Sequence, residues 1–373
     1  MKTQISCLLM LVFAVTMLAV GCGKTESSQA EKEGKALQSE QGNGEEKIED
    51  TESITPSSEI VPLEDGFSTV KYSGDYKLNE FLEQGGASTD AEVMSFLTEH
   101  LFSGVSGLKY SGNAFGCSTI SVKSPDGNYL FGRNFDWDSS CEALVVSSVP
   151  EEGYASLSTV NMGFIAAGTG MDLGQLSDQM KTVAALYAPL DGMNEKGLCV
   201  SVNMIQDFAT IKQNTNKPDI TTTTAVRLLL DRAADVDEAL KLLKQYDMHA
   251  SMGMMVHFAL ADAGGHSVVV EYIGNEMVVT DTPVVTNFYL APGEKNGIGT
   301  KQSHTRYKIL TELLEKNDTM EMQDVRDALD SVNQGNFGEY ESTEWSIVYD
   351  QGSGMVQYYH RENYEKAYPF QMP

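Results

Sequence analysis

A cysteine that could act as a nucleophile, and two charged residues that could support it, lie on the single segment 113–137, NAFGCSTISVKSPDGNYLFGRNFDW. Cys117 directly follows Gly116, and Arg133 and Asp136 come shortly before the end of the segment. A thiol reacts as its thiolate, and a neighbouring guanidinium lowers the pKa of a thiol and so favours that form. A cysteine with an arginine and a carboxylate beside it is therefore a candidate nucleophile.

The same segment has the pattern of a β-hairpin that would bring these groups together. Proline presets φ and glycine accepts positive φ at the PDG sequence, which predicts a turn centred on 126–127. Antiparallel pairing about that centre places Cys117 opposite Asp136, with both side chains on one face. Arg133 would then lie on the other face, unless a bulge at Gly132 turned it toward the thiol.

Composition excludes several function classes. The chain has 373 residues and a formal net charge of −27, which opposes binding to nucleic acid phosphates or to anionic lipid headgroups. We therefore expect no nucleic acid partner, and any membrane attachment must come from another source. The apolar content is sufficient for one large domain or two small ones.

The N-terminus supplies such an attachment. Residues 1–21 have one lysine and then an apolar run that is short for a membrane span, and the run ends in LAVGC. This pattern resembles a bacterial lipoprotein signal that is cleaved before Cys22, which is then lipidated. The alternative is an ordinary secretory signal, and in either case the mature protein works outside the cytoplasm. Residues 22–60 are acidic and almost free of apolar residues, which predicts a disordered tether.

Beyond the signal and the tether, three cysteines remain: Cys117, Cys141 and Cys199. An odd number cannot form a complete disulfide framework, so at least one thiol is left over. We interpret Cys141 and Cys199 as structural.

The rest of the chain predicts an α+β fold with two packed antiparallel sheets and helices outside them. We predict a helical segment over 61–116, followed by the catalytic domain over 117–373. Within the first, Val93, Phe96, Leu97 and Leu101 form the apolar stripe of a helix over 88–102 that must dock on the second. Predicted strands occupy 118–124, 128–135, 143–149, 154–168, 181–205, 254–288 and 344–361. Predicted helices occupy 221–246, where a break near 235–237 makes two, and 303–316 and 319–332.

Five motifs in order carry a resemblance to a known family. CSTISVKSPDGNYLFGRNFDW is followed by DGMNEKGL, VVTNF, SHTRY and EWSIVY. From Cys117 onward the chain resembles the choloylglycine hydrolase, or linear amide C-N hydrolase, family, which includes bile salt hydrolases, penicillin V acylases and an acid-ceramidase-like branch. The resemblance implies an Ntn-hydrolase αββα four-layer sandwich and hydrolysis of a linear amide without cofactor or metal.

The resemblance also implies roles for individual residues. Cleavage at Gly116-Cys117 would make Cys117 the first residue of a mature chain, with a free α-amino group whose reference pKa of about 7.7–8.0 suits a base. Its thiol would form an acyl-enzyme. Asp136 would hold the ammonium and Arg133 would lower the thiol pKa. The other implied site residues are Asn203 and Asn287 in the oxyanion hole and Arg306, which would tie the site together by charge-assisted hydrogen bonds.

Simpler structural interpretations stand beside these roles. Cys117 could be a buried thiol, Arg133 and Asp136 a cross-strand ion pair, the two asparagines turn or capping amides, and Arg306 a surface charge. The methionines of 248–255 could line a pliable acyl pocket or fill a core.

Alternative functions also stay open. An acyltransferase would share every site residue, and a non-catalytic ligand-binding lipoprotein would need none of them. The sequence does not rank bile salts, penicillin V, N-acyl homoserine lactones and fatty-acyl amides as substrates. It also leaves open the oligomeric state and whether the segment before Cys117 is cleaved off and retained as a small subunit.

Overall fold

The computed structural model describes residues 53–101, 116–137, 142–169, 173–335 and 342–373. The predicted signal, Cys22, most of the tether and Cys141 lie outside these ranges, so their roles stay predictions. Within these ranges, the helices are too short or too polar to cross a membrane.

The larger of two sheets has nine strands, in the spatial order β1-β2-β5-β6-β7-β8-β11-β12-β13. Its neighbours are antiparallel except for β2 and β5, which pair in parallel. The strands are β1 (Val61–Glu64), β2 (Phe67–Gly74), β5 (Ala143–Pro150), β6 (Ser156–Asn161), β7 (Asp191–Asn194), β8 (Cys199–Met204), β11 (Val256–Ala261), β12 (Ser267–Ile273) and β13 (Glu276–Asp281).

The second sheet has six strands, in the order β14-β3-β4-β15-β16-β17, and all its pairs are antiparallel. A separate parallel pair joins β9 (Asp219–Thr221) to β10 (Asp247–His249). The six strands are β3 (Cys117–Lys123), β4 (Tyr129–Trp137), β14 (Val284–Val285), β15 (Ser342–Asp350), β16 (Met355–His360) and β17 (Tyr368–Gln371).

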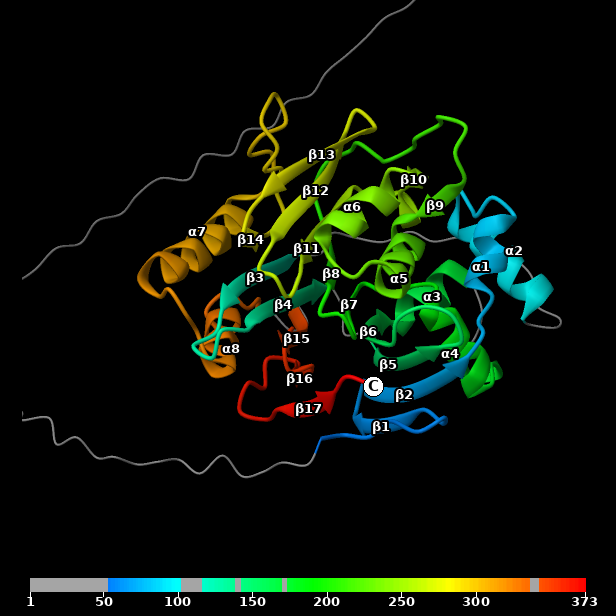
Figure 1. Ribbon diagram of the computed structural model, residues 1–373, viewed down its shortest axis with the longest axis horizontal. Helices are drawn as coiled ribbons and strands as arrows, with labels where there is room; N and C mark the ends of the chain where they lie inside the picture. The colour runs from blue at the N-terminus through cyan, green and yellow to red at the C-terminus, as the bar shows by residue number, and fades with distance from the viewer. Residues whose placement is uncertain (1–52, 102–115, 138–141, 170–172, 336–341) are drawn as a thin grey trace, which may run out of the picture. The chain divides into compact units, whose positions relative to one another are not determined.

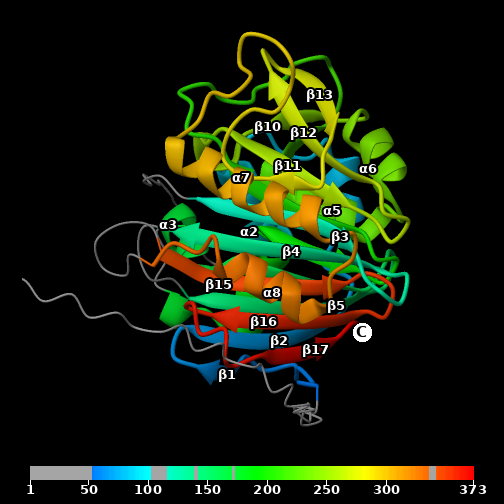
Figure 2. The ribbon, with the colours of Figure 1, turned by 90° about the vertical axis from the view of Figure 1, so that its left-hand side faces the viewer.

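Helices cover the outer faces of the two sheets (Figure 1). α7 and α8 lie over the six-stranded sheet, as Figure 2 shows, and α4 and α5 contact strands of the nine-stranded sheet. The predicted α+β fold with four layers is therefore confirmed. The helices are α1 (Leu78–Glu83), α2 (Asp90–His100), α3 (Met162–Thr169), α4 (Asp178–Leu186), α5 (Thr222–Arg232), α6 (Val236–Leu243), α7 (Lys301–Lys316) and α8 (Met322–Asp330), with short 3-10 turns at η1 (Leu173–Gln175) and η2 (Ser251–Gly253).

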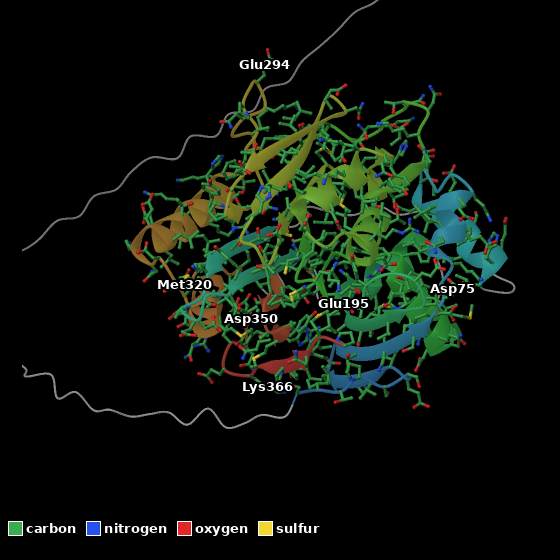
Figure 3. The ribbon with its side chains drawn as sticks, viewed as in Figure 1. Asp75, Glu195, Glu294, Met320, Asp350 and Lys366 are labelled. Carbon is green, nitrogen blue, oxygen red and sulfur yellow. The ribbon has the colours of Figure 1, made fainter. Side chains whose placement is uncertain are left out.

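Three apolar clusters fill the spaces between the layers. One lies between the nine-stranded sheet and its helices. A second contains Cys117 and lies between the two sheets. The third lies beneath α7 and α8 and includes Met320, which Figure 3 labels in the connection between these helices. The nucleophile candidate therefore sits in the central layer of the molecule.

The segment before Cys117 is more deeply built into the fold than predicted. It is not purely helical, because β1 and β2 extend the nine-stranded sheet. The Glu64 carboxylate also accepts hydrogen bonds from His360 Nδ1 at 2.6 Å and from Lys366 Nζ at 3.0 Å. This segment also forms the one parallel pair among the described strands of the nine-stranded sheet, which the prediction of wholly antiparallel sheets missed. The pair is parallel because β2 reaches the edge of β5 from a separate part of the chain.

The predicted tether also ends earlier than residue 60. Ile54 N donates to Pro369 O at 2.7 Å, and Lys71 N donates to Ser57 O at 2.6 Å. Backbone groups of residues 53–60 thus add to exposed strand edges, an interaction that composition does not reveal.

The predicted helix over 88–102 is confirmed as α2, with Thr89 as its N-cap. The Thr89 side chain accepts a hydrogen bond from Glu92 N at 3.2 Å, which satisfies one of the free N–H groups of the first turn. Its predicted apolar stripe packs into the cluster between the helices and the nine-stranded sheet. The docking of this helix on the rest of the chain is therefore confirmed.

Two regions predicted as strands throughout contain a helix as well as strands. α3 occupies the end of the region 154–168, and α4 occupies the beginning of the region 181–205. Both stretches are short and apolar, and periodicity alone does not separate a buried helix from a buried strand at that length. The Ser177 side chain, which accepts a hydrogen bond from Met180 N at 3.3 Å, caps α4.

Gly132 in β4 lets α8 approach the six-stranded sheet. A Cβ atom at this position would lie 2.6 Å from Val325 Cγ1 of α8 and 2.9 Å from Ile120 Cγ2 of β3. Both distances are shorter than van der Waals contact, and a packed core does not yield freely to added volume. This close approach, and not a bulge, accounts for the glycine.

We predict that Gly132→Ala lowers the free energy of unfolding by about 1–3 kcal/mol, because the added methyl group overpacks the space below α8. Urea denaturation of the purified protein measures the change. Gly264→Ala is the matched control, since an added Cβ there meets only Asp262 Oδ1, at 3.1 Å. Equal unfolding free energies for the two variants would contradict this account of Gly132.

Candidate active site

The hairpin forms as predicted, but its register is shifted by one residue. Cys117 pairs with Phe135, and Thr119 pairs with Arg133. The reason is the turn, in which Ser124 N donates to Asn128 O at 2.9 Å and so closes a three-residue loop. The prediction assumed a two-residue turn and was wrong on this point.

The corrected register changes which groups share a face. Cys117 and Arg133 are now on the same face without any bulge, and Asp136 lies on the opposite face with Ser118. The pairing between β3 and β4 is continuous through Gly132, so the suggested bulge there is absent from this pair. An irregularity does occur in β15, between Thr343 and Trp345, beside Asp136 and Phe135 of β4.

Cys117 is fully buried at the beginning of β3. Its backbone N donates to Asn287 Oδ1 at 2.8 Å, and its Sγ lies 3.9 Å from Val202 O in β8 of the other sheet. Burial raises the pKa of the Cys117 thiol to about 11, although the guanidinium of Arg133 acts in the lowering direction. In the uncleaved chain the thiol is therefore held in its neutral form near neutral pH.

Arg133 crosses the central layer from β4 to the nine-stranded sheet. Its Nε donates to Asp191 Oδ2 at 2.5 Å, and its Nη1 donates to Asn203 Oδ1 at 2.8 Å and to Ser201 Oγ. Both members of the pair with Asp191 are completely buried. A buried ion pair of this kind persists only with good geometry and further hydrogen bonds, and Arg133 has both.

Asp191 is a site residue that the sequence reasoning missed. It opens the motif DGMNEKGL, which served only as one of the five motifs of the resemblance. Besides Arg133, its carboxylate accepts a hydrogen bond from Trp345 Nε1 at 3.0 Å. A carboxylate at the start of a short apolar strand was the signal that could have found it, because buried charges require partners.

Asn203 presents an unused donor in the same place. Its Oδ1 accepts hydrogen bonds from Arg133 Nη1 and from Ser201 Oγ, the second at 2.7 Å. Asn203 Nδ2 and Arg133 Nη2 are buried and have no hydrogen-bond partner among the described residues. Each buried donor of this kind calls for an explanation, and a role in binding or catalysis is one of them.

On the other face of the hairpin, Arg306 of α7 binds four groups at once. Its Nη1 donates to Cys117 O at 2.8 Å, to Ser118 Oγ at 2.7 Å and to Asp136 Oδ2 at 3.1 Å. Its Nη2 donates to Asn287 Oδ1 at 2.7 Å. The interpretation of Arg306 as a surface charge is therefore wrong, because its side chain is buried and joins these residues.

The predicted roles of Asp136 and Asn287 stay predictions. The Asp136 carboxylate accepts hydrogen bonds from Arg306 and from Thr343 Oγ1 at 2.7 Å, and Cys117 N is bonded to Asn287. The donor of Asn287 is engaged as well, since its Nδ2 donates to Met204 O at 2.7 Å. Asn287 therefore positions the nitrogen of the cysteine in this structure.

Gly116 is held by the strand opposite. Asp136 N donates to Gly116 O at 2.9 Å, directly before Cys117. All the predicted site residues are thus brought together: Gly116, Cys117, Arg133, Asp136, Asn203, Asn287 and Arg306. A thiol, two guanidinium groups and unpaired N–H donors at one point suit nucleophilic attack on a carbonyl carbon.

We predict that the Arg133–Asp191 pair is coupled. Asp191→Asn alone should lower the free energy of unfolding by about 3–5 kcal/mol, because it leaves a buried guanidinium without its partner. The double variant Arg133→Gln/Asp191→Asn should cost less than the sum of the single variants. Urea denaturation of the four proteins measures this cycle, and simple additivity would contradict the coupling.

Comparison with known proteins relates the part of the chain that carries this site to amide hydrolases. Residues 117–289 match the family described as linear amide C-N hydrolases, choloylglycine hydrolase family. Penicillin V acylase from Pectobacterium atrosepticum is 31% identical over 100 residues, which are 24% of this chain and 26% of that protein. Bile salt hydrolase/transferase from Clostridium perfringens is 26% identical over 176 residues, 45% of this chain and 51% of that protein. The matches thus span about a quarter and about half of these two relatives.

A solved structure is also similar to this one. The crystal structure of a mutant conjugated bile acid hydrolase from Clostridium perfringens matches with a TM-score of 0.51 at 18% identity, over 69% of this chain and 92% of that one. At this identity the likeness shows the fold, which is the αββα sandwich predicted for an Ntn hydrolase. The resemblance carried by the sequence motifs is therefore confirmed, since residues 117–289 match the model of the choloylglycine hydrolase family of linear amide C-N hydrolases.

Proposed function

We propose that the protein hydrolyses a linear amide of a small acyl compound, with Cys117 as an N-terminal nucleophile. The observation that carries this proposal is the convergence of the Cys117 thiol, the Arg133 guanidinium and the unpaired Asn203 amide in one buried layer. A purely structural thiol has no use for unpaired donors beside it. The family match, which begins at Cys117, supports the same assignment.

The nucleophile becomes competent when the Gly116–Cys117 bond is broken. In this step the Cys117 thiol attacks the Gly116 carbonyl carbon, the C–N bond breaks and the acyl group passes to sulfur. Water then hydrolyses the thioester, which leaves a carboxylate on Gly116 and a free amine on Cys117. The hydrogen bond from Asp136 N to Gly116 O supports this step, because it stabilises negative charge on that oxygen.

The mature site then acts on the substrate. Cys117 Sγ attacks the amide carbonyl carbon, and its α-amino group takes the thiol proton and passes it to the departing amine. Water hydrolyses the resulting thioester and releases the acid. We assign Asn203 Nδ2, which is buried without a hydrogen-bond partner among the described residues, as the donor to the oxyanion, a contact worth about 3 kcal/mol in comparable enzymes.

Acyl transfer to an amine is a second candidate, favoured by the name of one relative, a bile salt hydrolase/transferase. It uses the same acyl-enzyme and differs only in whether an amine or water attacks the thioester. Adding a primary amine to the reaction distinguishes the two, because transfer yields a new amide while hydrolysis yields only the acid.

We predict that Cys117→Ser abolishes amide hydrolysis and leaves the fold intact. The purified wild-type protein should contain a polypeptide that begins at Cys117, detected by N-terminal sequencing and mass spectrometry. Activity is measured as amine release from a panel of acyl amides. Asn203→Ala should lower kcat by about a hundredfold with an unchanged N-terminus, since it removes one oxyanion donor. A fully active, uncleaved chain would refute the proposed nucleophile.

We also predict how the rate depends on pH. Only the neutral α-amine can accept the thiol proton, and its reference pKa is about 7.7–8.0. The value of kcat/KM should therefore fall as the pH drops below that range, and a variant that is not cleaved at Gly116 should show no activity at any pH. A rate that stays flat from neutral to acidic pH would argue against the amine as the base.

We propose further that the protein is exported and anchored through a lipidated Cys22, on the strength of its signal-like N-terminus. Cys22→Ala should then shift the protein from the membrane fraction to the soluble fraction of the producing cell. Membrane association that survives this substitution would contradict the anchor.

A further inference from the structure

A buried histidine and a buried glutamate lie beside the site, and the proposed steps use neither of them. His257 is on β11 and Glu271 is on β12, and both side chains are completely buried. His257 Nδ1 lies 3.0 Å from Glu271 Oε1. A buried pair of ionisable groups persists only when further hydrogen bonds replace the lost water, so the other partners of these two side chains show what the pair holds.

The histidine stands between the two asparagines of the site. It pairs across the sheet with Asn203 of β8, so the two side chains share one face. Its Nε2 donates a hydrogen bond to Thr286 O at 2.8 Å, directly before Asn287 in the chain. His257 therefore connects the strand that carries Asn203 with the loop 286–291, which follows β14 and carries Asn287.

The glutamate holds the same loop at its other end. Glu271 Oε2 accepts hydrogen bonds from Ala291 N at 2.6 Å and from Leu290 N at 3.2 Å, and Glu271 Oε1 accepts from Leu290 N at 3.0 Å. Burial acts to raise the pKa of Glu271, but the hydrogen bonds from His257 and from these two backbone N–H groups lower it below its usual value. The bonds to the loop thus favour the ionised carboxylate.

These acceptors place a proton on each ring nitrogen of His257. The carbonyl oxygen of Thr286 accepts hydrogen bonds and cannot donate one, so Nε2 carries a proton. Nδ1 faces an oxygen of the ionised Glu271 carboxylate, which also only accepts, so this nitrogen carries a proton as well. The pair is thus an ion pair whose hydrogen bonds all lead to the loop or to each other.

The loop has a third support on α7. Asn287 N donates to Ser303 Oγ at 2.7 Å, and Ser303 Oγ donates to Thr286 Oγ1 at 2.9 Å. Buried side chains therefore bind the backbone on both sides of Asn287, whose Oδ1 accepts a hydrogen bond from Cys117 N at 2.8 Å. A displacement of the loop would move the amide that positions the nucleophile.

We infer that His257 and Glu271 are positioning residues for the proposed amide hydrolysis, on which this inference rests. Through the loop they fix the place of Asn287, and through the pairing of β8 with β11 they fix the surroundings of Asn203. A misplacement of about 1 Å at a reacting centre costs about a hundredfold in rate. A pair that fixes these amides therefore contributes to turnover as well as to stability.

The experiment compares Glu271→Gln with Glu271→Ala in the full-length protein. In Glu271→Gln the amide nitrogen can donate to Nδ1 of a neutral His257 while the amide oxygen accepts from Leu290 N and Ala291 N, so the loop stays held. In Glu271→Ala all three donors lose their acceptor. The kcat for amine release should fall about tenfold or more in the alanine variant, with KM little changed, and should stay within about twofold of the wild type in the glutamine variant.

A second variant and a matched control separate positioning from stability. His257→Gln removes the histidine end of the pair and should also lower kcat, which tests the inference even if Glu271→Ala does not fold. His360→Gln is the control, because His360 is also buried and its Nδ1 also bonds a glutamate, Glu64 of the segment before Cys117, at 2.6 Å. It should reduce stability and leave kcat unchanged. Each kcat is referred to the amount of polypeptide that begins at Cys117, so slower cleavage does not count as slower turnover.

Hydrogen exchange of the loop, followed by mass spectrometry, reports on the pair without catalysis. The backbone N–H groups of Leu290 and Ala291 should be protected in the wild type and in Glu271→Gln and should exchange faster in Glu271→Ala. Faster exchange in the alanine variant of a protein that cleaves no amide would uphold the pair and reject the proposed function. Equal losses of kcat in the glutamine and alanine variants, or an unchanged kcat in an alanine variant whose loop exchanges freely, would overturn the inference.

Discussion

The buried ion pair between Arg133 and Asp191 is the interaction on which the rest of the site depends. It joins β4 of one sheet to β7 of the other across the central layer. A guanidinium in such a place needs a compensating charge and hydrogen-bond acceptors. Because Asp191 and Asn203 hold it, Arg133 can remain charged beside the thiol of Cys117 and act on its pKa. The pair thus connects the packing of the two sheets with the surroundings of the thiol that we propose as the nucleophile.

The opposite face of the hairpin carries a second arginine with a different task. Arg306 binds the carbonyl oxygen of Cys117, the carboxylate of Asp136 and the amide oxygen of Asn287. These bonds help hold the backbone at the beginning of β3 in place, since Cys117 O accepts from Arg306 of α7 and Cys117 N donates to Asn287, which follows β14. One arginine therefore acts near the sulfur, and the other fixes the main chain that carries it.

The segment before the nucleophile joins the fold rather than merely covering it. β2 pairs with β5 along its whole length, and α2 packs its apolar face into the cluster beside the nine-stranded sheet. These contacts do not depend on chain continuity, so a segment held in this way would stay attached after a single peptide bond is broken. The proposed cleavage before Cys117 is therefore compatible with an intact fold.

The resemblance to linear amide C-N hydrolases could be predicted from the sequence alone, because the identity and order of the motifs from Cys117 onward can be read without coordinates. The sequence also predicted the four layers and the docking of α2, since amphipathic patterns report which faces must be buried. The tertiary structure alone decided the hairpin register, which depends on one residue in a turn, and the partnership of Asp191 with Arg133. Both are long-range or single-residue properties, and local sequence patterns carry no record of which strand lies across from another.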